Sequence, residues 1–192
     1  LRTPLTRMKL QISLMKDEKA KSELEVDINE MTSMLDSYVS FVKTESPEPI
    51  ETIIINELIG DIVKTVEKNG VELTIKEKNT IQTSGRQIQL KRAFNNIIDN
   101  SKRYAKKIEI ILYTNEKDCV IEFNDDGEGI PKDKYEDVFK PFFTLDPSRN
   151  KLKGESGLGL TITRDIIRSH GGDIRLSDSN LGGLQLKVLL PL

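Results

Sequence analysis

Apolar residues recur at steps of three and four along the first quarter of the chain, and no other feature of the sequence restricts the fold as strongly. This spacing places the apolar residues on one narrow face of a helix, as in a coiled coil. A polar break at residues 16–20 divides the pattern into two helices, which are expected to form an antiparallel hairpin. The residues on this face are Leu5, Met8, Ile12, Met15, Leu24, Ile28, Met31, Leu35, Tyr38 and Val42.

The hairpin is expected to end at a polar segment, residues 44–49, that contains two prolines. Proline stops a helix because it lacks the backbone N–H and clashes with the preceding turn. We therefore predict a helical domain at 1–46, a linker at 47–50 and a second domain at 51–192. One hairpin alone cannot cover this narrow apolar face. Two copies are therefore expected to pair into a four-helix bundle.

The second domain mixes strands and helices, which predicts an α+β fold. Residues 119–123 alternate between apolar and polar, as in a half-buried strand. Residues 144–156 are polar and have no periodicity, and they are expected to form a lid over a ligand. The predicted strands are 51–55, 71–76, 81–83, 107–114, 119–124, 173–177 and 184–190, and the predicted helices are 57–68 with Asn56 as its cap, 86–104, 135–139 and 161–169.

Composition excludes several classes of function. The net charge is −2 and no basic run is interleaved with aromatic residues, so nucleic acid is not an expected partner. No apolar stretch approaches the roughly 20 residues that span a bilayer, so membrane attachment is expected only through segments outside this sequence. The single cysteine, Cys119, is interpreted as a buried thiol in a reducing compartment. The chain is expected to lie in the cytosol or to face it.

The strand predicted at 119–124 leads into an acidic, glycine-rich turn at residues 125–130. A carboxylate at the end of a strand accepts a hydrogen bond from an amino group, and Gly127 and Gly129 allow the backbone to pass close to a flat ligand. A dinucleotide-binding fingerprint is only weakly supported, because Pro131 follows at once and no third glycine has the required spacing. An EF-hand is excluded, because a strand precedes the turn and Asp133 stands where the loop needs a terminal glutamate. A surface turn would be the simplest interpretation if the turn stood alone.

Two further segments have the chemistry of a binding site. Asn96, Asn100, Arg103 and Tyr104 share one face of the helix predicted at 86–104. Amide oxygens suit Mg²⁺, a guanidinium binds phosphate, and a phenol covers a sugar or an aromatic ring. Residues 157–160 contain two glycines and open the last predicted helix, whose free N–H groups form an anion site.

The binding-site segments described above, together with residues 1–5 and 139–143, resemble sequence motifs, called boxes, of the sensor histidine kinases of two-component systems. They occur in the same order as in that family. The wording of residues 1–7 and 91–96 is similar to the EnvZ type of osmosensor kinase. The resemblance implies a HisKA hairpin for dimerisation and phosphotransfer, followed by a Bergerat-type (GHKL) α/β sandwich that binds ATP. The matching segments are residues 1–5 for the tail of the H box, 96–104 for the N box, 125–130 for G1, 139–143 for F and 156–160 for G2.

The resemblance also implies roles for single residues. Asp125 accepts a hydrogen bond from the adenine amino group, Asn100 holds Mg²⁺ against the phosphates, and Arg103 and Tyr104 contact the nucleotide. A carboxylate suits the amino group of adenine and opposes the carbonyl oxygen of guanine, so ATP is expected to bind more tightly than GTP. The implied cofactor-binding residues are Asn96, Asn100, Arg103, Tyr104, Asp125, Gly127, Gly129, Ile130, Phe143, Ser156, Gly157, Leu158, Gly159 and Leu160.

Several positions depart from the pattern of the family. The phosphoacceptor histidine lies two residues before the leucine that is Leu1 here, so this histidine and the acidic residue after it are expected to be absent from the sequence. Glu155 stands where the G2 box usually has its first glycine, and Thr144 stands where relatives often have a basic residue. The resemblance gives Thr3 a role in removing the phosphoryl group from the response regulator.

His170 is the only histidine and is interpreted as a structural residue rather than as a phosphoacceptor. It lies in the last turn of a predicted helix, before Gly171 and Gly172, where a histidine interacts favourably with the helix dipole.

The sequence therefore predicts the cytoplasmic core of a sensor histidine kinase from a bacterial inner membrane. ATP and Mg²⁺ are the expected cofactors, a response regulator is the expected partner, and the hairpin is expected to form a homodimer. Two alternatives stay open. A related ATPase of the gyrase, Hsp90 and MutL group would share the nucleotide fold, but the hairpin argues against it. A dimerisation module with a decayed nucleotide site is favoured only by Glu155.

Overall fold

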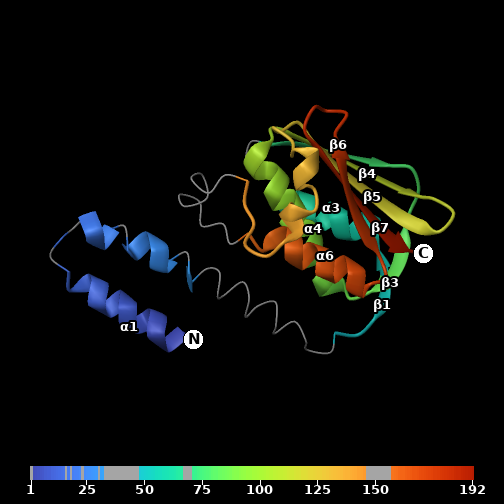
Figure 1. Ribbon diagram of the computed structural model, residues 1–192. Helices are drawn as coiled ribbons and strands as arrows, with labels where there is room; N and C mark the ends of the chain where they lie inside the picture. The colour runs from blue at the N-terminus through green and yellow to red at the C-terminus, as the bar shows by residue number, and fades with distance from the viewer. Residues whose placement is uncertain are drawn as a thin grey trace. The chain divides into compact units, whose positions relative to one another are not determined.

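The computed structural model describes all of the chain except residues 1, 16, 18, 23, 30, 33–47, 67–70 and 146–156. The side chains of Arg2, Thr3 and Lys9 are also outside the description. The chain divides into two compact units (Figure 1). The first consists of Leu1–Ser46 and Lys140–Leu158, and the second of Pro47–Phe139 and Gly159–Leu192.

The first unit begins with helix α1 (Arg2–Ser13), and residues 19–22 and 24–29 are also helical. The carboxylate of Asp17 accepts hydrogen bonds from the backbone N–H groups of Lys19 (3.0 Å) and Ala20 (3.2 Å), as the cap of a helix does. The hairpin and the four-helix bundle stay predictions, and Leu35, Tyr38 and Val42 lie outside the described residues. On the predicted seam, Leu5, Ile12 and Ile28 are buried, whereas Met8, Leu24 and Met31 are exposed.

The second unit contains a five-stranded sheet with strand order β2-β4-β5-β7-β6. Its strands are β2 (Glu72–Glu77), β4 (Lys107–Thr114), β5 (Asp118–Asp125), β6 (Asp173–Asp178) and β7 (Leu184–Pro191). β2 pairs with β4 in parallel, and the other neighbours are antiparallel. A separate antiparallel pair is formed by β1 (Glu51–Ile54) and β3 (Gln82–Gly85).

Three helices lie on one side of the five-stranded sheet (Figure 1). They are α3 (Ile55–Val66), α4 (Gln87–Tyr104) and α6 (Gly159–Ser169). The helical spacing of Leu90, Ala93, Ile97 and Ser101 in the sequence predicts that these residues form the core face of α4, and all four are buried. Phe94 of the same helix meets Phe123 of β5, with 6.0 Å between ring centroids. The second unit is therefore an α/β sandwich with one helical layer and one sheet.

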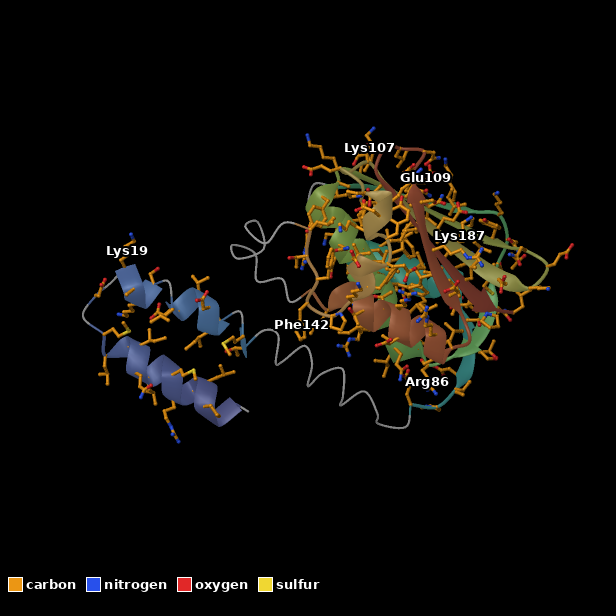
Figure 2. All side chains as sticks on the ribbon, in the orientation of Figure 1. Lys19, Arg86, Lys107, Glu109, Phe142 and Lys187 are labelled. Carbon is orange, nitrogen blue, oxygen red and sulfur yellow. The ribbon has the colours of Figure 1, made fainter. Side chains whose placement is uncertain are left out.

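The other face of the sheet carries charged side chains that pair with one another. Lys76 pairs with Glu109, and Lys187 pairs with Glu122 at 2.8 Å (Figure 2). Tyr113 donates a hydrogen bond to Glu122 at 2.8 Å. These pairs run across neighbouring strands, where opposite charges stabilise the sheet.

Strand β5 is not half-buried as its alternating sequence predicts. Val120 and Ile121 are both buried, although they point to opposite faces of the sheet. β5 lies in the middle of the sheet, so Val120 has a neighbour on each side. Tyr113 on β4 and Leu189 on β7 stand directly opposite it and cover its side chain. An alternating sequence predicts which residues of a strand are exposed only where side chains of neighbouring strands do not cover that face.

Two other local predictions are wrong. Asn56 does not cap a helix, since it lies in the first turn of α3, and its side chain bonds to the carbonyl of Asn79 and the N–H of Ile81. The amide thus joins α3 to the turn before β3. The single short helix predicted at 135–139 is replaced by two 3-10 turns, η2 (Lys132–Lys134) and η3 (Asp137–Phe139).

Gly60 lies inside α3, where an added Cβ would meet no atom within 4 Å. Glycine inside a helix loses more backbone entropy on folding than alanine does. Gly60→Ala is therefore expected to raise the free energy of unfolding by about 0.5–1 kcal/mol. Urea unfolding followed by circular dichroism measures this change, and a loss of stability would show that the helix is not packed as described.

Candidate functional site

Asp125 ends strand β5, and its carboxylate is buried in the second unit. One oxygen, Oδ1, accepts hydrogen bonds from the backbone N–H groups of Gly127 (3.1 Å) and Leu184 (2.9 Å). The other, Oδ2, accepts one from the hydroxyl of Ser101 (3.2 Å). A carboxylate has about four acceptor positions. Three donors therefore fix the orientation of Asp125 and leave capacity for one further donor.

The turn after Asp125 is packed so closely that side chains are excluded from it. A Cβ on Gly183 would lie 2.3 Å from Asp125 Oδ1 and 2.4 Å from the backbone nitrogen of Gly127. A Cβ on Gly127 would lie 3.0 Å from the backbone oxygen of Tyr104. Gly129 has a φ of 71°, in the left-handed region that glycine favours. These contacts bring the turn, the end of α4 and the start of β7 together around one carboxylate.

Asp126, the next residue, has a structural role. Its Oδ1 accepts hydrogen bonds from the backbone N–H groups of Lys106 and Lys107, both at 2.8 Å. These two bonds hold the pKa of the Asp126 carboxyl below its ordinary value, and the bond from Lys107 has the larger effect. The two adjacent aspartates therefore differ, because Asp126 ties the turn to the start of β4 whereas Asp125 faces the site.

The lowered pKa of Asp126 makes a prediction about acid stability. A carboxyl whose pKa is lower in the folded state stabilises the protein above its unfolded pKa, about 3.9, and loses this contribution as the pH falls through the folded value. Asp126→Asn keeps an oxygen acceptor but removes the charge. We expect wild type to be more stable than this variant at pH 7 and the difference to shrink below pH 4.

Urea unfolding of both proteins at several pH values between 7 and 3 measures this difference. A difference that is the same at pH 7 and pH 3 would contradict the role given to the charge of Asp126.

The polar face predicted on α4 lies in the second unit, where Asn96 and Asn100 are half-buried and Arg103 and Tyr104 are exposed. The Asn96 side chain donates a hydrogen bond to the backbone carbonyl of Gly159 at 3.3 Å. This bond connects α4 with the first residue of α6. Asn96 therefore contacts the glycine-rich segment as well as belonging to the polar face.

Helix α6 begins at Gly159, earlier than predicted, so that Gly159 and Leu160 form its first turn. A Cβ on Gly159 would meet no atom of the described residues within 4 Å, and the first N–H groups of this turn have no partner within the helix. The hydroxyls of Thr161 and Thr163 bond to the carbonyls of Phe139 (3.0 Å) and Gly159 (2.8 Å), respectively. The start of α6 is thus held in place.

Of the remaining predicted residues, Ile130 lies in the second unit, and the others belong to the first unit or lie outside the description. Within Lys140–Leu158, the Phe142 N–H donates to the carbonyl of Gly157 at 3.0 Å. Both residues have positive φ, 63° for Phe142 and 62° for Gly157. Phe143 and Leu158 belong to this segment too. Ser156, Gly154 and Glu155 are outside the described residues, as is the side chain of Thr3.

Two partners of Asp125 were not predicted from the sequence. Ser101 was assigned only to the core face of α4, although its hydroxyl reaches the carboxylate. The backbone N–H of Leu184 comes from the far end of the chain. Two features of the sequence could have indicated these partners. Ser101 places a hydroxyl on the buried face of α4 directly after Asn100, and Gly182 and Gly183 form a glycine pair just before the last strand.

The described residues contain no cluster of three or more histidine, cysteine, aspartate or glutamate side chains that would hold a metal ion by themselves. A magnesium ion usually keeps several waters and takes one or two protein oxygens together with substrate phosphates. The amide oxygen of Asn100 is a ligand of this kind, so the residues present fit Mg²⁺ bound together with a phosphate group. Across the described part of the chain, no helix combines the length and apolar character needed to cross a membrane.

Comparison with known proteins identifies a family of ATPases and similar sensor kinases. Residues 85–192 match the family described as histidine kinase-, DNA gyrase B-, and HSP90-like ATPase. The whole chain is 31% identical to the sensor histidine kinase GtrS of Pseudomonas aeruginosa and 31% identical to the sensor histidine kinase CpxA of Escherichia coli K12. The chain spans only 40% and 45% of the lengths of these relatives, respectively.

Solved structures of similar fold are also sensor kinases. The mycobacterial sensor histidine kinase MprB is 25% identical, with a TM-score of 0.66 over 74% of this chain and 97% of that one. The histidine kinase AdeS of Acinetobacter baumannii shares the fold at 18% identity, with a TM-score of 0.65 over 99% of this chain and 95% of that one.

Proposed function

The chain belongs to the family of histidine kinase-, DNA gyrase B- and HSP90-like ATPases, and on this premise we propose that it is the ATP-binding core of a sensor histidine kinase. The observation that carries the proposal is the buried carboxylate of Asp125, held by three donors at a turn too tight for side chains. A fixed acceptor of this kind suits the amino group of adenine. GtrS and CpxA, which match along the whole chain, are sensor histidine kinases, and they support this function over the other functions of the family.

The nucleotide is proposed to lie along α4 and the start of α6. Asp125 selects adenine, and Gly127, Gly129 and Ile130 line the ring where the backbone turns closely. Phosphates are proposed to meet the free N–H groups at Gly159 and Leu160, since a helix N-terminus favours anions. The other proposed nucleotide contacts are Asn96, Arg103, Tyr104, Phe143, Ser156, Gly157 and Leu158.

Mg²⁺ is proposed to be held by Asn100 and the phosphates. When bound, the ion neutralises negative charge on the phosphate oxygens and orients them. The side chains of α4 have the complementary task of fixing the triphosphate, because phosphoryl transfer depends mainly on positioning and electrostatic stabilisation.

In the intact protein, the γ-phosphoryl group is proposed to pass to a histidine that the resemblance places two residues before Leu1. A response regulator would then receive the group, and Thr3 would help to remove it. The exposed seam residues Met8, Leu24 and Met31 support a homodimer, because pairing with a second copy would bury them. The sensor kinase relatives support a place on the cytoplasmic side of a bacterial inner membrane.

The proposal is tested with the intact protein and γ-labelled ATP. A kinase is expected to acquire label that resists base and is lost in acid, as phosphohistidine does. Hydrolysis of ATP without labelled protein would contradict kinase activity and favour the gyrase and Hsp90 type of ATPase. Equally negligible nucleotide binding by wild type and Asp125→Asn would instead favour a dimerisation module with a decayed site.

A further inference from the structure

His170 follows the last residue of α6, and both of its ring nitrogens make hydrogen bonds in the second unit. Nδ1 lies 2.7 Å from the backbone carbonyl of Ile166, which only accepts. Nε2 lies 3.0 Å from the backbone nitrogen of Arg86, whose N–H only donates. Nδ1 must therefore carry a hydrogen and Nε2 must not. The structure requires the neutral imidazole in one tautomer.

The hydrogen bond to Arg86 lies at the start of α4 (Figure 2). The first N–H groups of a helix have no partner within the helix, and the side chain of Arg86 does not cap them. Two side chains from distant parts of the sequence contribute instead. Nε2 of His170 accepts from Arg86, and the carboxylate of Glu48 accepts from the N–H of Ile88 at 2.5 Å.

The imidazole has little freedom to move away from this position. A Cβ on Gly85, the residue before Arg86, would lie 2.8 Å from Cδ2 of the ring. After the ring, Gly171 has a φ of 73°, and the N–H of Gly172 bonds to the carbonyl of Ile167 at 3.0 Å. This is the Schellman ending of a helix, which fixes the residue before it.

Helix α4 extends from this clamp to the candidate site. The same helix carries Asn96 and Asn100 on its polar face and Ser101, which holds Asp125. We therefore expect a change at the first turn of α4 to shift the residues around the carboxylate, because one helix carries both. His170 and Glu48 contact none of these residues directly in the hydrogen bonds described above, so they act through the position of α4.

We propose that neutral His170, together with Glu48, is a positioning residue that holds the start of α4, and that protonation of His170 releases this clamp and weakens nucleotide binding. The second half of this statement rests on the proposed function. Protonated imidazole has two donors, so Nε2 would present an N–H to the N–H of Arg86. The bond that the neutral ring accepts would be lost.

The charges around the ring determine the direction of the effect. Burial lowers the pKa of His170, Arg86 lowers it further, and the carbonyl of Ile166 and the charge of Glu48 raise it in part, leaving it below the ordinary value. Among the described residues, Arg86 and Glu48 are the charged groups that act on the ring. A lowered pKa means that the neutral clamp is complete above about pH 6.5 and is lost as the pH falls through the lowered pKa.

The single histidine makes this proposal directly measurable. Long-range ¹⁵N NMR of the nucleotide-free chain reports the tautomer and pKa of one imidazole, and amide hydrogen exchange reports the N–H groups of Arg86 and Ile88. We expect the Nδ1–H tautomer, a pKa below about 6.5 and loss of protection at Arg86 beyond the intrinsic pH dependence of exchange as the ring protonates. The Nε2–H tautomer, or protection at Arg86 that ignores the titration, would overturn the clamp.

The functional half is tested with His170→Gln as the matched variant. Glutamine supplies one acceptor and one donor but does not titrate, so it preserves both bonds. From pH 7.5 to about one unit below the pKa that the NMR measurement gives for the ring, the affinity of wild type for a Mg²⁺-bound ATP analogue is expected to fall about fivefold more than that of the variant. The titration of the nucleotide itself is common to both proteins and cancels.

Parallel pH profiles for wild type and His170→Gln would overturn the positioning role, even if nucleotide binds well. A wild type that binds no nucleotide at any pH would contradict the proposed function instead. The clamp itself would still be decided by the NMR and exchange measurements, which need no nucleotide.

Discussion

Replacing Asp125 with asparagine is expected to weaken ATP binding by about ten- to a hundredfold, the size of a lost hydrogen bond to a charged acceptor. The amide oxygen of asparagine can still accept from the N–H groups of Gly127 and Leu184. Its amino group would then face Ser101, whose hydroxyl can turn to accept. The fold is thus preserved, while the side chain presents a donor to the amino group of adenine.

Isothermal titration with a non-hydrolysable ATP analogue and Mg²⁺ measures this loss. The matched control is Asp126→Asn, which makes the same change one residue later, at a carboxylate that bonds to Lys106 and Lys107 rather than facing the site. We expect the control to bind ATP nearly as well as wild type. Equal losses in both variants would mean that the negative charge of the turn, and not the acceptor on Asp125, is responsible. A relative gain of GTP over ATP in Asp125→Asn would support direct contact with the base.

Gly183→Ala is expected to be the most damaging addition of one methyl group. The new Cβ would lie 2.3 Å from Asp125 Oδ1 and 2.4 Å from the backbone nitrogen of Gly127. The carboxylate oxygen is held by the N–H groups of Gly127 and Leu184, and the nitrogen belongs to the backbone, so neither atom moves away easily. The N–H of Gly183 also bonds to the carbonyl of Asp125 at 3.0 Å. Overpacking of this kind costs about 1–3 kcal/mol of stability, and we expect nucleotide binding to be lost with it.

Gly60→Ala is the matched control for this variant, because the same methyl group enters open space on α3. Urea unfolding and nucleotide titration of both variants separate the effects. The expected pattern is lower stability and no binding for Gly183→Ala, and higher stability with normal binding for Gly60→Ala. Normal binding by Gly183→Ala would show that the start of β7 does not shape the site.

The sequence was sufficient for the order of the elements and for the family. Strong periodicity located α4 and its core face, and the predicted ranges of β4, β5, β6 and β7 agree closely with the structure, because these signals are local. The resemblance to sensor histidine kinases is confirmed by the family that residues 85–192 match and by the relatives GtrS and CpxA. The EnvZ type describes this chain only loosely, since the relatives named here are other sensor kinases.

Long-range partners could not be predicted in the same way. The N–H of Leu184 reaches Asp125 across 59 positions of the sequence, and the N–H of Arg86 reaches His170 across 84. No local pattern encodes such pairs, because they depend on which strands and helices become neighbours. His170 is an example of a residue whose partner was missed. Its structural role at the end of a helix was predicted, but the hydrogen bond that its ring accepts from the N–H of Arg86 was not.

A crystal structure of the chain with a Mg²⁺-bound ATP analogue tests the proposed site most directly. We expect the amino nitrogen of adenine at about 3 Å from the carboxylate of Asp125, with the phosphates near Asn100 and the start of α6. A nucleotide bound elsewhere, with the Asp125 carboxylate contacting only Ser101, Gly127 and Leu184, would contradict the proposed site.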